Sequence, residues 1–470
     1  MSLFQTQRPD FLISGERARL IPVIADTSKE GRITSCTLAA FMSVNEFAKG
    51  LLDSIGIRLG KTSKVECFTE IVFQNKDKTA SKIRPDGLIV VTTGKKQWTA
   101  LVEAKIGKAE LTAEQVESYL DLAKEHKIDA VITLSNQFSA TPTHHPITVS
   151  KNKLRSVGLY HWSWTFLITE AVMWVKYHGV TDPDQAYILE ELVRYLQHDG
   201  SGVLSFDSMN GTWKDVCAAV QNRISLKKTS PEVLDSVASW HQLSRNLSLH
   251  LGLAVGANVG IFLKKAHKDD SKKRLDDDAA LLVSEQLLIT EFDVPAAAGR
   301  IKFAADVEKR CVVVSMRLRA PEERATTKGR INWLTSQLKK ATNPDLSVRA
   351  IWPSRAADTM ALLSEINEKG ADALLCENNS LKPVSFEVVL TRDIGAKFKG
   401  SRTFIQESGP LLMEFYEQAG QHLKEWVASA PKIKTKKIDN TLEDEIDETI
   451  EKETVIPSVK AEKTNINSAA

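Results

Sequence analysis

The chain has 470 residues, enough for about three domains of roughly 150 residues each. Hydrophobic residues make up 42% and charged residues 26%, as in soluble globular proteins, and no apolar run of about 18 residues predicts a transmembrane helix. The net charge of +2, from 62 basic and 60 acidic residues, does not mark a nucleic-acid-binding protein, although a local basic groove is compatible with it.

The cysteines and the N-terminus indicate a cytoplasmic protein that is not secreted. The first residues lack the basic and then apolar pattern of a secretory signal. The five cysteines are scattered and form no Cys-x-x-Cys pair, which argues against a cysteine-based zinc site or a disulfide framework. The sequence leaves the oligomeric state open, and a dimer is compatible with it.

The first third of the chain predicts a mixed α/β core after a lead-in segment of about 33 residues. Apolar residues at helical spacing and then at strand spacing indicate, in order, a helix, three strands, a helix and a strand. A helix that crosses over into a final strand favours parallel pairing with an earlier strand. The expected elements lie at residues 35–55, 65–73, 83–93, 98–106, 112–127 and 129–134.

The rest of the chain divides into three further segments. Residues 151–250 are expected to be mostly helical, with helices at 186–196 and 231–249. Residues 251–430 form a second α/β unit of unknown role, and residues 431–470 have the polar composition of a disordered tail. The second unit has strands expected at 280–290, 301–305, 311–318, 347–352 and 385–390, and helices at 327–341, 356–369 and 411–427.

A pair of carboxylates and a lysine carry the chemistry. In the strand at 98–106, side chains alternate, so Glu103 and Lys105 share one face while their neighbours pack in the core. Asp86 begins the preceding strand, and pairing brings its carboxylate next to Glu103. Two adjacent carboxylates are costly unless a cation lies between them. The arrangement therefore predicts a Mg²⁺ or Mn²⁺ site held by Asp86 and Glu103, with Lys105 assisting an attacking water.

Pro85-Asp86, followed seventeen positions after the aspartate by Glu103-Ala104-Lys105, resembles the PD-(D/E)XK nuclease superfamily. The element order also resembles the restriction-endonuclease-like core of that family. The resemblance covers about the first 140 residues, within a domain expected at residues 1–150. It implies a metal-dependent nuclease, with Asp86 and Glu103 as metal ligands and Lys105 as the catalytic lysine. It also implies DNA as a partner, and the sequence does not separate DNA from RNA.

Four further residues are candidates for supporting roles. Gln115 and Tyr119 resemble the QxxxY element of the RecB-like branch of this superfamily. Glu46, in the first expected helix, resembles the acidic residue that many members add to the metal site. Glu70, on the first expected strand, is a rival for that third ligand.

Most of these residues also have an ordinary structural explanation. Asp86 fits a turn after Pro85, and Glu103 with Lys105 fits an exposed charge pair. Gln115 fits a capping box with Thr112, and Tyr119 fits a core position. A second hypothesis for the whole chain is therefore a catalytically silent nuclease-fold module that binds a partner through residues 251–430.

Overall fold

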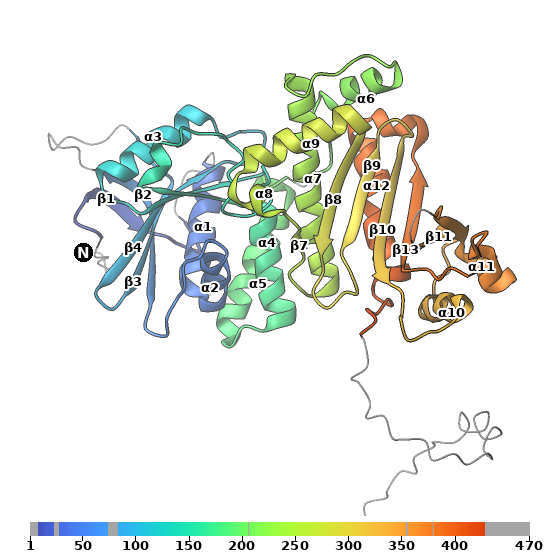
Figure 1. Cartoon of the computed structure of the whole chain (residues 1–470). Coiled ribbons are helices and arrows are strands. Elements are labelled where there is room, and N and C mark those ends of the chain that lie inside the picture. The colour runs from blue at the N-terminus through green and yellow to red at the C-terminus, as the bar shows by residue number, and fades with distance from the viewer. Residues whose placement is uncertain are drawn as a thin grey trace, which may run out of the picture. The chain divides into compact units, whose positions relative to one another are not determined.

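The computed structural model describes residues 8–22, 28–73, 83–204, 206–353, 356–378 and 380–427 (Figure 1). Within them the chain is mixed α/β, with two sheets. The tail expected to be disordered, residues 431–470, lies outside the described residues. No helix in the described ranges is both long and apolar enough to cross a membrane.

The first sheet has six strands in the order in which they occur along the chain. The first four pair antiparallel, whereas the last three run parallel to one another. The parallel pairing after the helical crossover was expected from the sequence and is confirmed. The strands are β1 (Leu12–Arg17), β2 (Lys64–Phe73), β3 (Gly87–Thr93), β4 (Lys96–Ala104), β5 (Ala130–Ser135) and β6 (Gly158–Ser163).

Helices cover both faces of this sheet, so its central strands are buried on both sides. One face packs against α3 (Ala113–Glu125). The other face packs against four helices, namely α1 (Lys29–Ser43), α2 (Asn45–Asp53), α4 (Trp164–Met173) and α5 (Pro183–Gln197). Alternate residues of one strand therefore enter different cores: Leu101 lies in the α3 cluster, and Val102 lies in the opposite one.

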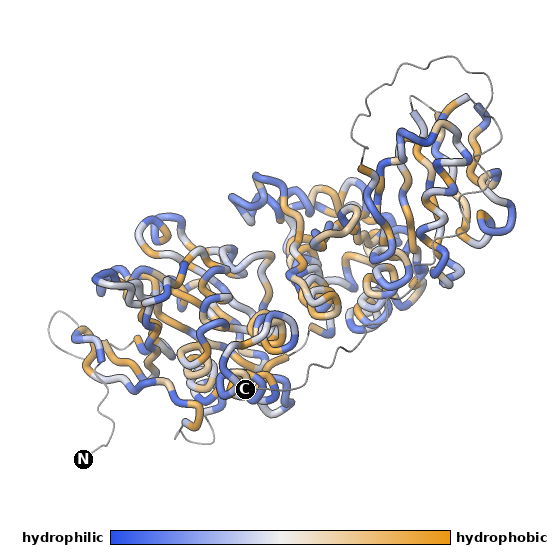
Figure 2. The backbone as a smooth tube through the Cα atoms, turned by 90° about the horizontal axis from the view of Figure 1, so that it is seen from below, coloured by the Kyte–Doolittle hydropathy of each residue, from blue (hydrophilic) through white to orange (hydrophobic). Residues whose placement is uncertain are grey.

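The second sheet has seven strands, all antiparallel to their neighbours. Its order is β12-β11-β13-β10-β9-β8-β7, and Figure 2 shows hydrophobic residues gathered along the strands and packed helices. The strands are β7 (Gly260–Ile261), β8 (Leu287–Asp293), β9 (Ile301–Asp306), β10 (Cys311–Arg319), β11 (Leu346–Ile351), β12 (Thr359–Leu362) and β13 (Ser385–Asp393).

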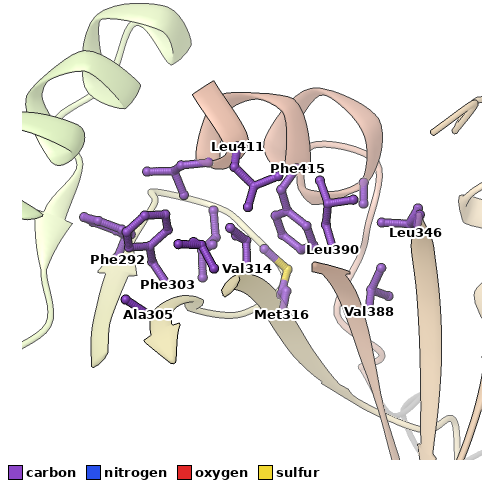
Figure 3. Close-up of a cluster of buried hydrophobic side chains, with 14 of the residues drawn as sticks. Phe292, Phe303, Ala305, Val314, Met316, Leu346, Val388, Leu390, Leu411 and Phe415 are labelled. Atoms are coloured by element: carbon purple, nitrogen blue, oxygen red, sulfur yellow. The ribbon is translucent and has the colours of Figure 1, made fainter. Parts of the chain in front are cut away.

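The core of the second sheet lies between the strands and the helices beside them. Figure 3 shows Leu411 and Phe415 above Val314 and Met316. The helices of this part are α6 (Trp213–Gln221), α7 (Pro231–Val255), α8 (Lys265–Asp269), α9 (Ser271–Glu285), α10 (Thr327–Gln337), α11 (Leu363–Lys369) and α12 (Ser401–Phe415). Short 3-10 or π turns lie at Lys153–Arg155, Trp174–His178, Asp199–Ser201, Gly370–Leu374, Gly395–Lys399 and Tyr416–Gly420.

Several boundaries differ from the sequence-based predictions. The lead-in segment contains β1, and β6 extends the first sheet beyond residue 150. The expected helix at 35–55 is two helices, since Val44 has extended backbone angles between them. The expected strand at 280–290 is the end of α9 followed by β8, because Gln286 adopts the left-handed conformation that ends the helix. The expected helix at 356–369 begins with β12, and the last helix begins at Ser401.

Candidate active site

Strand β4 places Glu103 on the face of the first sheet that α3 covers. Its neighbours Val102 and Ala104 pack in the opposite cluster, as side-chain alternation along a strand requires. Glu103 is only 3% exposed. The carboxylate is therefore removed from water, and the alternative explanation of Glu103 and Lys105 as an exposed charge pair is wrong.

Asp86 lies next to Glu103 because β3 and β4 pair with Gly87 opposite Val102. The Ala104 backbone N–H donates a hydrogen bond to Asp86 Oδ2 over 2.8 Å. This bond ties the aspartate to the neighbouring strand rather than to a local turn. Burial, and then the charge of Glu103, raise the pKa of Asp86 to about 8.

The residue after Asp86 has to be small. A Cβ atom at Gly87 would come within 2.5 Å of Leu38 Cδ1 and 3.1 Å of the Phe68 carbonyl oxygen. A side chain at this position would displace α1 or β2, so glycine permits the close approach that sets the position of the preceding aspartate.

Lys105 follows β4 and bridges two carboxylates. Its Nζ atom donates to Glu103 Oε1 over 2.7 Å and to Glu30 Oε1 over 3.0 Å. Its side chain is 15% exposed. Burial opposes the charged form, but the hydrogen bonds and charges of Glu103 and Glu30 outweigh it and raise the pKa of Lys105. Lys105 therefore remains a cation at neutral pH.

Helix α3 contributes Gln115 and Tyr119. Thr112 caps the helix by accepting a hydrogen bond from the Gln115 backbone N–H. The Gln115 side chain reaches across to the sheet, where Nε2 donates to Glu103 Oε1 over 2.7 Å. The Tyr119 hydroxyl lies 3.4 Å from the same Nε2 atom. Burial, followed by the charge of Glu103, raises the pKa of Tyr119.

The acidic residue contributed by the first helix is Glu30, which sequence reasoning missed. The expected helix began at residue 35, but α1 begins at Lys29 and carries Glu30 in its first turn. An acidic residue just ahead of the apolar helical pattern was the signal available in the sequence, because carboxylates are favoured at helix N-termini.

The structure does not bring Glu46 or Glu70 into this cluster. Glu46 lies in the first turn of α2, a separate helix, and its Oε1 atom accepts from the Thr181 backbone N–H over 3.0 Å. Glu70 is exposed and has a positive φ of 53°. It lines another cavity, of about 300 Å³, together with Arg17 and Arg19.

The donor set suits a hard divalent cation that retains most of its waters. Within the described ranges no group of three or more His, Cys, Asp or Glu side chains is arranged to hold a metal ion. Mg²⁺, however, is commonly bound by only one or two carboxylates plus water. Glu103 Oε2 is buried without a hydrogen-bond partner in the described part of the chain, and such an oxygen is costly unless a ligand satisfies it. Asp86 and Glu103 therefore fit a Mg²⁺ or Mn²⁺ ion.

Residues from the middle of the chain hold the segment that follows Lys105. Trp164 Nε1 donates to the Lys105 carbonyl oxygen over 2.8 Å, and the Gly107 N–H donates to the Gly202 carbonyl oxygen over 2.7 Å. The Asn136 amide donates to the carbonyl oxygens of Gly107 and Gly202. Sequence analysis assigned Trp164 and Gly202 to a helical segment and did not connect them with the site.

Comparisons with protein-family models, with curated proteins and with solved structures find no match for this chain. The function therefore has to be argued from the chemistry of this cluster.

Proposed function

We propose that this protein is a metal-dependent nuclease with a restriction-endonuclease-like core, and that it hydrolyses phosphodiester bonds in DNA. The observation that carries the proposal is the convergence of Asp86, Glu103 and Lys105 at the end of β4. The element order β2-β3-β4-α3-β5 supports the same conclusion. Gln115 adds support, because it bonds directly to the carboxylate that the nuclease resemblance assigns to the metal.

Asp86 and Glu103 would hold the cation, which supplies positive charge next to the attacked phosphate. The raised pKa of Asp86 means that this residue gives up a proton when it becomes a ligand. Gln115 fixes the Glu103 carboxylate through one oxygen, while the other oxygen, Oε2, has no partner in the described residues. Glu103 is therefore oriented before any ligand arrives, which lowers the cost of binding one.

Lys105 would act on the phosphate or on the attacking water. Its amine is held at the same carboxylate oxygen that Gln115 binds. A fixed positive charge at this point stabilises the negative charge that develops on the phosphate oxygens during hydrolysis. Glu30 bonds the same amine from α1 and would keep it charged and directed toward the site.

The test is cleavage of plasmid DNA, single-stranded DNA and RNA with Mg²⁺ or Mn²⁺. Wild-type protein is expected to cleave DNA in a metal-dependent manner, and Asp86→Asn and Lys105→Ala are expected to be inactive. Glu46→Gln is the matched control, since it removes a carboxylate charge outside the cluster. If wild type and Lys105→Ala cleave equally, the proposed roles are wrong. If the wild type cleaves no substrate, the silent nuclease-fold binding module becomes the better hypothesis.

A further inference from the structure

A second polar cluster lies on the sheet directly beside the candidate active site. In the parallel pairing of β4, β5 and β6, Glu103 is opposite Thr133, and Thr133 is opposite His161. All three occupy the face that α3 covers, because Leu101, Val131 and Leu159, two residues earlier on each strand, belong to the α3 cluster. Thr133 and His161 are almost completely buried.

His145 joins this row from the loop between β5 and β6. Its Nε2 atom lies 2.8 Å from Thr133 Oγ1, and His161 Nδ1 lies 2.8 Å from the same hydroxyl oxygen. His161 Nε2 lies 2.8 Å from the Gln137 carbonyl oxygen. Two imidazoles therefore converge on one hydroxyl, next to the strand that carries Glu103.

One arrangement of protons satisfies both imidazole contacts of the Thr133 hydroxyl. The Tyr160 carbonyl oxygen, 3.4 Å from Thr133 Oγ1, is a longer and therefore weaker alternative acceptor. The Gln137 carbonyl only accepts, so His161 carries its proton on Nε2 and its Nδ1 accepts from the Thr133 hydroxyl. A hydroxyl has one proton, so Thr133 Oγ1 must accept from His145 Nε2. His145 Nδ1 then accepts from the Ile147 backbone N–H over 3.0 Å, and the nearby Ile147 carbonyl receives no proton from this ring.

Both imidazoles are neutral in this arrangement. Burial lowers the pKa of His145 to about 4, and burial followed by the neighbouring His145 lowers the pKa of His161 to about 3. The cluster therefore adds no positive charge beside the carboxylates that would compete with a bound cation.

The same cluster ties down the loop that follows β5. His161 holds this loop twice, because its backbone N–H donates to the Pro142 carbonyl oxygen over 2.9 Å and its side chain bonds Gln137. His145 holds the far end of the loop, at Ile147. At the near end, Asn136 bonds the Gly107 carbonyl oxygen, two residues after Lys105. The loop is thus fixed at both ends and starts beside the candidate active site.

We propose that His145, acting through Thr133 and His161, is a positioning residue that fixes residues 136–147 as one wall of the substrate site. The proposal rests on the proposed nuclease function for its substrate, a nucleic-acid backbone. The loop begins beside the site, where Asn136 bonds the Gly107 carbonyl oxygen. Further along it the hydroxyl groups of Thr141 and Thr143 lie 3.0 Å apart, and hydroxyl groups of this kind commonly contact phosphate oxygens.

The first experiment tests the pinned loop without any assay of activity. Thr133→Val keeps the shape of the side chain but leaves both imidazoles without their shared hydroxyl, whereas Thr133→Ser keeps that hydroxyl. In the full chain, long-range ¹H–¹⁵N spectra are expected to show both histidines protonated on Nε2 in wild type and Thr133→Ser. Amide exchange in residues 136–147 is expected to be about tenfold faster in Thr133→Val. Unchanged exchange in that variant, or a Nδ1-protonated His145 in the wild type, would overturn the proposal.

The second experiment tests the wall itself through DNA cleavage. Thr133→Val and His145→Ala are expected to raise KM for DNA about tenfold and to leave kcat within about threefold, because the loop contacts substrate and not the reacting atoms. His145 is half-buried, so His145→Ala serves if Thr133→Val folds poorly. Faster amide exchange with an unchanged KM would mean that the cluster has only a structural role, and it would refute the proposal that residues 136–147 form one wall of the substrate site. If the wild-type protein cleaves no DNA, the proposed function is refuted, and the proposed role of residues 136–147 in binding substrate is refuted with it. The exchange measurement would still decide whether the His145–Thr133–His161 cluster fixes this loop.

Discussion

Asp86→Asn should change the pH dependence of stability in the metal-free protein. The substitution removes the titrating carboxyl group but keeps an oxygen that accepts from the Ala104 N–H. The pKa of Asp86 is about 8 in the folded protein and has a reference value of 3.8. Between these values the folded protein therefore holds one proton more than the unfolded chain.

This excess proton fixes the sign and the size of the effect. The stabilisation that protonated Asp86 gives to the folded protein is fully present below the pKa of this residue in the unfolded chain. It is lost as the pH rises through the pKa of Asp86 in the folded protein. With one excess proton bound to the folded protein, the free energy of unfolding falls by about 1.4 kcal/mol for each unit by which the pH rises. The stability of Asp86→Asn relative to wild type should therefore increase by about 3 kcal/mol between pH 5 and pH 7.

The measurement is urea unfolding in the presence of EDTA at pH 5, 6 and 7, followed by tryptophan fluorescence. Glu46→Gln is the control, because burial, which raises the pKa of that carboxylate, is outweighed by the hydrogen bonds from Thr181 and from the Glu46 backbone, which together lower the pKa. The control should not show the same trend. A stability difference for Asp86→Asn that stays constant across this range would refute the argument that Asp86 is protonated in the metal-free fold.

Metal binding should depend on the same proton. If the ion displaces a proton whose pKa is about 8, the apparent dissociation constant for Mg²⁺ should fall about fivefold between pH 7 and pH 8. Calorimetry of the full chain measures this change. A pH-independent affinity would mean that Asp86 is not a ligand.

Three further predictions concern individual parts of the chain. Lys105→Ala should reduce cleavage at least about hundredfold while changing DNA affinity less than about threefold, measured by cleavage beside binding, because one lysine is a small part of a binding groove. Glu30→Gln should reduce cleavage about tenfold and Glu46→Gln should not, because Glu30 contacts Lys105 whereas Glu46 contacts Thr181; equal rates for the two variants would contradict this. Deletion of residues 431–470 should leave cleavage within about tenfold of wild type, since the composition of this segment cannot support a core.

The central part of the first sheet was predictable because its strands alternate or are continuously apolar. The same alternation predicts that Glu103 and Val102 point to opposite faces, and the pairing of two consecutive strands predicts that Asp86 lies next to Glu103. The edge strand β1 was not predictable in this way, since only Leu12 among its residues is buried. Strand β6 was not predicted because its buried polar residues His161 and Ser163 interrupt the apolar pattern.

Errors at helix ends had the largest effect on the candidate site. The helix that carries Glu30 begins before its apolar periodicity does, so the acidic residue fell in the lead-in segment and Glu46 took its place in the prediction. In the second sheet, one apolar run belongs to both α9 and β8, and only the left-handed backbone at Gln286 separates them. Neither boundary is set by hydrophobic periodicity, which was the main basis of the prediction.

The candidate site also depends on contacts that no local pattern encodes. The three residues that resemble the nuclease motif lie within twenty positions of one another, yet the backbone after Lys105 is held by Trp164 and Gly202. Gly202 has a φ of 81°, and a Cβ atom there would lie 3.1 Å from Ile106 Cδ1. A larger residue at position 202 would therefore meet both backbone strain and a close contact with Ile106. Ile106 directly precedes Gly107, whose carbonyl oxygen accepts from the Asn136 amide. The geometry of Lys105 is thus set in part from the middle of the chain, and a unit that ended at residue 150 would lack these supports together with β6.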